Sequence, residues 1–166
     1  MDDRAKWDRK YRDGSHPARE PEPVLLRALE RAAPGHALDV ACGRGRHAIA
    51  LADAGFTVDA VDVSPVGLAS ARERAKGRAI RWIEADLADY ELGSYDLIVC
   101  VDFTDESLIP RLLAALRPGG WFVYAGRPRA LCRYGPQPGD VERWFGALTT
   151  HHHVENEERV EFIGRR

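Results

Sequence analysis

A glycine-containing loop between two apolar runs holds the residues whose types and spacing could do chemistry. The loop reads Gly43-Arg44-Gly45-Arg46-His47-Ala48, and Asp62 follows at the end of the next apolar run. Glycines let the backbone approach a ligand closely, and a carboxylate at the end of a second strand can accept both hydroxyls of a ribose. On pattern alone, this is a dinucleotide-binding fingerprint.

Two further acidic residues favour a different nucleoside ligand. Asp39 ends the apolar run before the loop, and Asp86 ends the third run. A carboxylate so close to the loop would repel a pyrophosphate and attract a cationic ligand, and it could also brace the amides of the loop. Asp86 could accept a hydrogen bond from an adenine amino group. Acidic residues at three strand ends therefore predict a pocket for a neutral or positive nucleoside.

Alternating strands and helices are expected to position these residues. The strand-like runs have β-branched and aromatic residues on both faces, which is typical of parallel strands covered on both sides. They cover residues 36–41, 56–63, 78–85, 95–101 and 120–125, and helices are expected over 24–33, 46–54, 65–76, 106–116 and 140–146. Ser64 and Pro65 suit the N-cap and the first position of the helix over 65–76. Residues 87–94 leave room only for a turn of helix, and 148–164 predict an antiparallel hairpin.

This order predicts an α/β fold in one domain. We expect a doubly wound, mostly parallel, seven-stranded Rossmann-like sheet with an antiparallel C-terminal hairpin. Residues 1–34 would form an N-terminal helical lid region, 36–125 a cofactor-binding half, and 126–166 a compact acceptor-side tail.

Composition narrows the possible partners and the compartment. In 166 residues, 24 lysines and arginines nearly balance 26 aspartates and glutamates, so the overall charge does not favour nucleic acid. No apolar stretch reaches the ~20 residues of a membrane span, and the N-terminus is too charged for a signal peptide. Three widely spaced cysteines without a CxxC pattern suit a reducing compartment. A cytoplasmic protein with a small-molecule substrate is expected, and its oligomeric state stays open.

Five segments in register resemble the motifs of the class I S-adenosylmethionine-dependent methyltransferases. They are LDVACGRGRHA, VDAVDVS, EADL, YDLIVCVDF and LRPGGWFVY, and together the resemblance covers roughly residues 36–125. The segments DVACGRGRHA and KWDRKYR and the compact tail resemble those of the small tellurite-resistance-type subgroup. The resemblance implies S-adenosyl-L-methionine as the cofactor.

The resemblance also implies where the cofactor would lie. Asp39 and the backbone of Gly43–Gly45 would lie near its methionine end, Asp62 would hold the ribose hydroxyls, and Val63 would lie beside the adenine. Asp86 and Leu87 would lie at the adenine edge. The full set of expected cofactor-binding residues is Asp39, Ala41, Cys42, Gly43, Gly45, Asp62, Val63, Asp86, Leu87 and Val101. We expect Asp62 to be an exposed strand-end carboxylate and Asp59 to lie in mid-strand, away from the ribose.

Several chemically suggestive residues have simpler structural explanations. Asp39 and Asp86 could each be a cap or a turn former. Cys42 is expected to be a small buried packing residue, because nothing adjacent would lower its pKa. His151-His152-His153 is expected to be polar edge-strand surface, since alternation along a strand sends the middle ring to the opposite face. No metal site is expected. Trp82, Trp121 and Phe122 are expected in the core.

The acceptor end is less defined by the sequence. Ligands in open α/β sheets bind beyond the carboxyl ends of the strands, where Asp102 follows the fourth strand. Asp102 is the best candidate for a base, with helix capping or a solvated carboxylate as the equal alternative. The N-terminal segment could fold over as a lid with Trp7, Tyr11 and His16, and Tyr11 is the second catalytic candidate. A soft or anionic nucleophile would need no strong base.

The sequence thus favours an S-adenosylmethionine-dependent methyltransferase that acts on a small molecule by in-line transfer. One alternative is a non-catalytic cofactor-binding or interaction protein with a degenerate acceptor site. A more distant alternative is an NAD(P)-dependent oxidoreductase.

Overall fold

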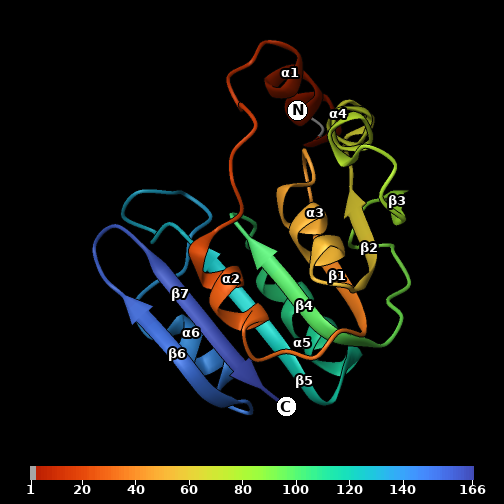
Figure 1. Cartoon of the computed structure of the whole chain (residues 1–166). Helices are drawn as coiled ribbons and strands as arrows, with labels where there is room; N and C mark the ends of the chain where they lie inside the picture. The colour runs from red at the N-terminus through yellow and green to blue at the C-terminus, as the bar shows by residue number, and fades with distance from the viewer. Residues whose placement is uncertain (1–2) are drawn as a thin grey trace.

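The sheet has seven strands in the order β3-β2-β1-β4-β5-β7-β6 (Figure 1). The computed structural model describes residues 3–166, and Met1 and Asp2 of the expected lid region lie outside the described residues. The strands are β1 (His36–Val40), β2 (Thr57–Asp62), β3 (Ile80–Glu84), β4 (Tyr95–Val101), β5 (Leu116–Gly126), β6 (Thr149–Glu155) and β7 (Val160–Arg165). Strands β1 to β5 pair in parallel, whereas β7 runs antiparallel to both β5 and β6. The predicted fold class is confirmed.

The helices also follow the predicted order. They are α1 (Asp3–Arg12), α2 (Pro23–Leu29), α3 (Arg46–Asp53), α4 (Pro65–Ala75), the 3-10 helix η1 (Glu106–Leu108), α5 (Ile109–Ala115) and α6 (Asp140–Phe145). The predicted cap of α4 is confirmed, because the Gly67 amide donates to Ser64 Oγ at 3.1 Å and Pro65 opens the helix.

Three boundaries differ from the prediction for local reasons. Helix α2 ends at Leu29 rather than at residue 33, and a turn at residues 30–31 follows it; Pro34 also disfavours helical conformation at the residue before it. The helix expected over 106–116 is divided into η1 and α5, with Pro110 in the first turn of α5. Strand β5 begins at Leu116 rather than at Gly120, because Leu116 pairs with Tyr95 and the residues that follow form an irregularity in the ladder.

Two helical layers cover the sheet. Leu25 of α2, Leu51 of α3 and Leu68 of α4 belong to the buried cluster on one face. Leu112 of α5 and Phe145 of α6 belong to the cluster on the other face. Both faces of the central strands are therefore apolar, as the uninterrupted hydrophobic runs predict.

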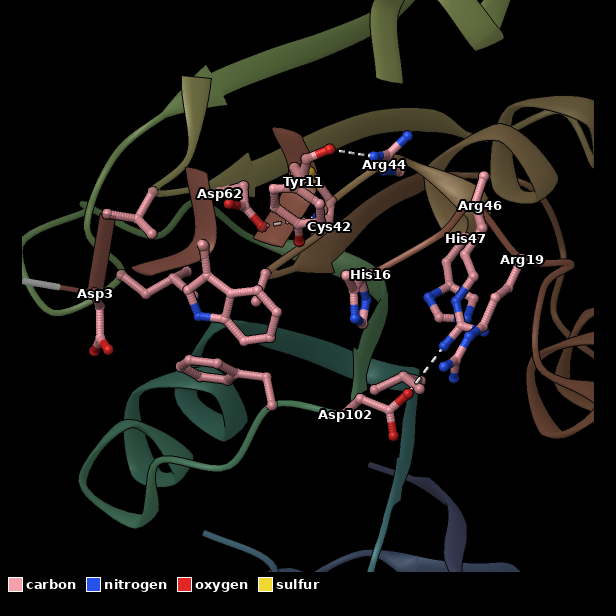
Figure 2. Close-up of a pocket in the computed structure, with 18 of the residues that line it drawn as sticks. Asp3, Tyr11, His16, Arg19, Cys42, Arg44, Arg46, His47, Asp62 and Asp102 are labelled. Atoms are coloured by element: carbon pink, nitrogen blue, oxygen red, sulfur yellow. Dashed lines mark hydrogen bonds and ion pairs between the residues drawn. The ribbon is translucent and has the colours of Figure 1, made fainter. Parts of the chain in front are cut away.

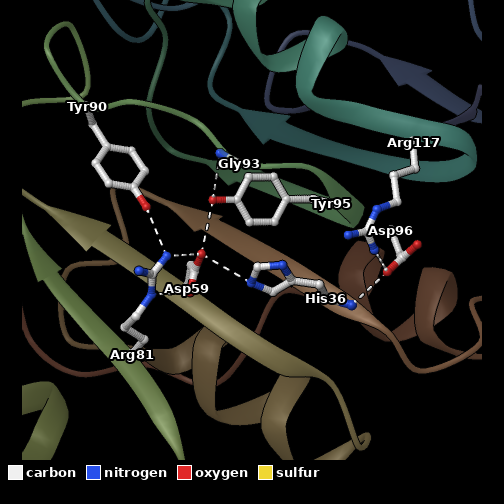
Figure 3. Close-up of polar contacts among 8 residues, drawn as sticks. All are labelled: His36, Asp59, Arg81, Tyr90, Gly93, Tyr95, Asp96 and Arg117. Atoms are coloured by element: carbon white, nitrogen blue, oxygen red, sulfur yellow. Dashed lines mark hydrogen bonds and ion pairs between the residues drawn. The ribbon is translucent and has the colours of Figure 1, made fainter.

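On the second face of the sheet, polar side chains join neighbouring strands by hydrogen bonds (Figure 3). They lie next to the connection between β3 and β4, which contains no helix. Asp59, in the middle of β2, is only 2% exposed. It accepts from Arg81 Nε at 2.7 Å and Nη2 at 2.6 Å, and from Tyr95 Oη at 3.1 Å. His36 Nε2 lies 3.1 Å from the same carboxylate. Asp59 thus joins four neighbouring strands.

The three histidines of β6 do not converge. A register shift between Thr150 and His152 interrupts the strand's alternation. The His151 ring packs against Trp121 with centroids 4.7 Å apart, whereas His152 Nε2 lies 3.0 Å from Glu161. Within residues 3–166, no three His, Cys, Asp or Glu side chains are grouped to hold a metal ion. The same part of the chain contains no helix long and apolar enough to cross a membrane.

Candidate functional site

A cavity lies at the carboxyl ends of β1, β2 and β4, where the topology brings separate chain segments together (Figure 2). The glycine loop, the residues after β2 and β3, and the residues after β4 form its sheet side. The N-terminal segment covers it. The lining includes Trp7, Tyr11, His16, Arg19, Ala41, Cys42, Gly43, Arg44, Arg46, His47, Asp62, Val63, Asp86, Leu87, Val101, Asp102, Phe103 and Asp105. Eight of the ten expected cofactor-binding residues are among these, and Asp39 and Gly45 are not.

Left-handed backbone conformations shape the glycine loop. Gly43 has φ +52° and Gly45, the N-cap of α3, has φ +74°. A Cβ on Gly45 would lie 2.6 Å from the Trp82 ring, and one on Gly43 would lie 2.6 Å from Tyr11 Oη. Both positions therefore need glycine for backbone conformation and for space. Ala41 adopts φ +53° without that freedom, which places local strain directly before the loop.

Asp62 is a buried carboxylate, so the expectation that it is exposed is wrong. It is 5% exposed, because the loop and α4 close around it. Its Oδ2 accepts from the Gly43 amide at 2.7 Å and its Oδ1 accepts from the Ser64 amide at 2.8 Å. Burial raises the pKa of the Asp62 carboxyl. Each oxygen keeps a lone pair, so the group can still accept two further hydrogen bonds from the cavity side.

Asp39 forms a buried hydrogen bond with the start of α3, directly after the glycine loop. Its Oδ2 accepts from the Ala48 amide in the first turn of α3 at 2.9 Å, and the side chain is 1% exposed. Burial raises the pKa of Asp39 to about 8. Asp39 therefore braces the start of α3.

His47, in the first turn of α3, is an uncharged residue between Asp39 and the Glu22 amide. Its Nε2 accepts from the Glu22 amide at 3.4 Å, and its Nδ1 lies 3.9 Å from Asp39 Oδ1. Burial lowers the pKa of His47 to about 3, so the imidazole is uncharged at neutral pH. Because Nε2 accepts, the proton of the neutral ring is assigned to Nδ1.

The segment after β3 is held in place by a side chain of α5. Leu87 is buried, and the Asp86 Oδ1 accepts from the Ala88 amide at 2.9 Å. Arg111 of α5 donates to the carbonyls of Leu87, Ala88 and Tyr90 at 3.1, 2.8 and 2.6 Å. The sequence reasoning missed Arg111, since a lone arginine on an amphipathic helix carries no signal of that contact.

Asp102, the expected base, is engaged by two arginines. It has φ +56° after β4. Its Oδ2 lies 3.1 Å from Arg46 Nη2 and its Oδ1 lies 3.1 Å from Arg159 Nη1. Glu22 joins the same cluster, at 3.1 Å from Arg46 and 2.8 Å from Arg159. Asp102 lines the cavity as part of a compensated ion-pair cluster.

Tyr11, the second catalytic candidate, lies against the glycine loop. It is 7% exposed, and a Cβ on Gly67 would meet its ring at 2.8 Å. Burial, and then the Asp62 charge, raise the pKa of the Tyr11 phenol, so the hydroxyl stays protonated at neutral pH. Tyr11 suits a cavity wall and a hydrogen-bond donor better than a base.

Helix α1 is fixed by polar contacts to the start of α4 at its middle and to the glycine loop near its C-terminal end. Ser64 Oγ donates to the buried Asp8 carboxylate at 2.5 Å, and the Val66 amide donates to the same oxygen at 3.4 Å. Arg44 Nη2 donates to the Tyr11 carbonyl at 2.6 Å, and the guanidinium lies 5.6 Å from the Tyr11 ring. These contacts place Trp7, Tyr11 and His16 over the cavity, where the sequence predicts a lid.

Cys42 is a packing residue, as expected. It is 6% exposed, and burial raises the pKa of its thiol, so it is not an activated nucleophile. Trp121 and Phe122 are buried, whereas Trp82 is only partly buried and packs on the edge of the core.

Comparisons with known proteins point to one family. The family model described as "Methyltransferase domain" matches residues 37–120, about half of the chain. A ubiquinone biosynthesis O-methyltransferase of Thiobacillus denitrificans is 29% identical over 122 residues, which is 66% of this chain and 53% of that protein. The chain thus spans about half the length of this curated relative.

Two solved structures have a similar fold. TehB from Haemophilus influenzae matches with a TM-score of 0.80 and 16% identity, over 95% of this chain and 66% of that chain. The N-methyltransferase NodS from Bradyrhizobium japonicum, in complex with S-adenosyl-L-homocysteine, matches with a TM-score of 0.83 and 21% identity, over 98% and 97% of the two chains. At these identities, the likeness shows the fold alone.

Proposed function

The chain belongs to the class I S-adenosylmethionine-dependent methyltransferases, whose cofactor is S-adenosylmethionine, and we propose that it methylates a small-molecule acceptor. The observation that carries the proposal is the cavity itself: the glycine loop, Asp62 and the Asp86–Leu87 segment line one side, and the N-terminal aromatic residues lie across from them. The same enclosed space would hold the cofactor and a small acceptor.

The residues present fit the cofactor. Gly43 presents bare backbone to the cavity, and Asp62 keeps two lone pairs for ribose hydroxyls. Val63 and Leu87 would contact the adenine, with Asp86 at its edge, while the loop backbone would lie near the methionine end. Ala41, Cys42 and Val101 supply small apolar walls. The nearby carboxylates of Asp62 and Asp86 would favour a sulfonium over a pyrophosphate.

A small acceptor is supported by how the open side is covered. Helix α1 lies over one part of the cavity, and residues 127–139 connect β5 to α6 without a further domain. Lys6 of α1 lies 5.5 Å from the Tyr134 ring, so the segment after β5 contacts the covering helix. A folded macromolecular substrate would have to displace α1.

The bound cofactor supplies an electrophilic methyl group on sulfur. The chain's own contribution would be to hold the acceptor atom in line with the sulfur–methyl bond at about 3 Å and to exclude water, which can supply much of the rate. Asp102 and Arg46 would border the acceptor through their ion pair. Tyr11 would fix the position of the loop and the cofactor.

A binding assay and a transfer assay test the proposal together. S-adenosylmethionine or S-adenosylhomocysteine at about 100 times its dissociation constant should add ~2.7 kcal/mol to the free energy of unfolding. That corresponds to a rise of roughly 5–10 °C in Tm, and NAD should give none. Labelled cofactor with cell extract should then yield a methylated small molecule. A shift with NAD alone would contradict the cofactor assignment, and tight binding without any product would favour the non-catalytic alternative.

A further inference from the structure

His16 occupies a defined position on the cavity wall just after α1 (Figure 2). Gly14, with φ +75°, turns the chain at the end of the helix, and the His16 amide donates to the Lys10 carbonyl at 3.2 Å. The imidazole meets Trp7 edge-on, with centroids 5.4 Å apart and an angle of 83°, and meets Tyr11 at 5.6 Å and 75°. Two aromatic contacts and a backbone hydrogen bond therefore orient the ring.

The ring nitrogens of His16 are free to accept a proton. Among the groups of residues 3–166, none forms a hydrogen bond with either nitrogen. The charged groups around the ring are Lys10 of α1, Arg19, Arg46 of α3 and Asp102 after β4. Burial, and then Arg19, Lys10 and Arg46, lower the pKa of His16, while Asp102 opposes them. The imidazole is accordingly neutral at pH 7, with an available lone pair.

Several other proton acceptors on the cavity wall already have hydrogen-bond or ion-pair partners. Each oxygen of Asp102 lies 3.1 Å from a guanidinium nitrogen. Asp105 Oδ1 accepts from the Ser107 amide at 3.0 Å and from its hydroxyl at 2.7 Å. His47 uses its accepting nitrogen for the Glu22 amide. His16 differs from Asp102 and His47 because, among residues 3–166, its accepting nitrogen has no competing partner.

We propose that His16 is the general base of the reaction and that the methyl acceptor is a phenol-type hydroxyl compound, an inference that rests on the proposed methyl transfer. The acceptor's O–H bond breaks as its proton passes to a ring nitrogen of His16. The oxygen forms its bond to the methyl carbon while the sulfur–methyl bond breaks and its electron pair remains on sulfur. The sulfonium charge disappears and the imidazolium charge appears, so charge and atoms balance.

The surroundings of His16 favour such an acceptor. Arg19 lines the cavity within electrostatic reach of His16, and a nearby cation stabilises an oxyanion and so acidifies a bound hydroxyl. The rings of Trp7 and Phe103 also line the cavity and offer apolar surface for a flat ring. A hydroxyl that is acidic and attached to an aromatic ring satisfies both features.

The transfer arm of the test uses His16→Gln, with His151→Gln as the matched control because His151 is exposed on β6 and far from the cavity. Each protein receives labelled cofactor and the same cell extract, and the labelled products are classified as ethers, thioethers, amines or esters. We expect aryl methyl ethers from the parent and the control, and a rate at least on the order of 100-fold lower for His16→Gln. The pH profile of the parent should level off above the pKa of His16, whereas the residual rate of the variant should keep rising with pH.

A second measurement does not depend on turnover. The nitrogen resonances of 15N-labelled histidine, assigned to His16 by their loss in His16→Gln, should show a neutral ring at pH 7 with and without S-adenosylhomocysteine. A charged His16 ring at pH 7, products other than ethers, or a His16→Gln rate within threefold of the parent would overturn the inference while methyl transfer stands. The absence of any labelled product would instead refute the proposed function.

Discussion

Replacing Asp62 with alanine should separate what the carboxylate does for the loop from what it does for the cofactor. The substitution removes the acceptor of two buried amides, Gly43 N at 2.7 Å and Ser64 N at 2.8 Å. An unsatisfied buried donor costs about 1–3 kcal/mol, so the two amides together cost roughly 2–6 kcal/mol. Burial disfavours the Asp62 charge and raises its pKa, and removing that charge offsets part of the cost. We therefore expect a loss near the lower limit, about 2 kcal/mol.

Two measurements follow from this estimate. Without ligand, the Tm of Asp62→Ala should fall by roughly 4–8 °C, since 1 kcal/mol shifts the Tm of a domain of this size by about 2–4 °C. Binding of S-adenosylhomocysteine, followed by calorimetric titration, should weaken by at least ~100-fold. This factor corresponds to two lost charged-acceptor hydrogen bonds of about 1.5 kcal/mol each, at ~1.4 kcal/mol per factor of ten.

The control for this experiment is Asp89→Ala. Asp89 is exposed on the segment after β3, and its side chain takes part in no contact within the described residues. Its loss should change neither the Tm nor the affinity. A folded Asp62→Ala protein that melts with the parent and binds S-adenosylhomocysteine equally well would refute both the bracing role and the ribose contact.

Three further predictions concern residues behind the cavity. Asp39→Asn should gain stability relative to the parent as pH rises from about 4 to 8: the folded pKa of about 8 lies above the ordinary aspartate value of 3.8, so the parent loses stability through that window. Denaturant titrations at several pH values measure the difference, and a constant gap would contradict it. Arg111→Ala should weaken S-adenosylhomocysteine binding on the order of tenfold by releasing three carbonyls of the segment after β3; calorimetry that gives the parent affinity would disprove this. Asp59→Ala should lower the free energy of unfolding by roughly 1–3 kcal/mol, because the buried Tyr95 hydroxyl loses its acceptor, whereas the Arg81 side chain is 65% exposed and can be solvated; an unchanged denaturation curve would show that these contacts do not stabilise the fold.

The features predicted correctly from the sequence are those that depend on neighbouring residues in the chain. Alternating apolar runs gave the strands to within a few residues, and the Ser64-Pro65 pair gave the start of α4. The order of strands and helices then limited the topology, because parallel strands need crossovers of one hand. The position of the cavity follows from this topology, since the carboxyl ends of the strands meet at one edge.

The features that the sequence does not reveal depend on residues far apart in the chain. Asp59 lies in mid-strand as expected, but the sequence does not show that Arg81, Tyr95 and His36 converge on it. An alanine there cannot serve as a neutral control for Asp62. The engagement of Asp102 depends on Arg159, which reaches it from the turn between β6 and β7. The sequence alone does not show whether an aspartate has a structural or a catalytic role, because that role depends on partners that are distant in the chain.

The contacts of Ser64 connect the lid to the cofactor side of the cavity. Its amide donates to Asp62 Oδ1 at 2.8 Å, and its hydroxyl donates to Asp8 of α1 at 2.5 Å while accepting from the Gly67 amide. The hydroxyl can make both bonds because it has one hydrogen and two lone pairs. A displacement of α1 would therefore remove the acceptor of a buried hydroxyl that lies next to the proposed ribose carboxylate. Ser64 thus helps to hold α1 over the acceptor side and Asp62 on the cofactor side. Disturbing the position of α1 should therefore weaken cofactor binding, and the reverse should also hold.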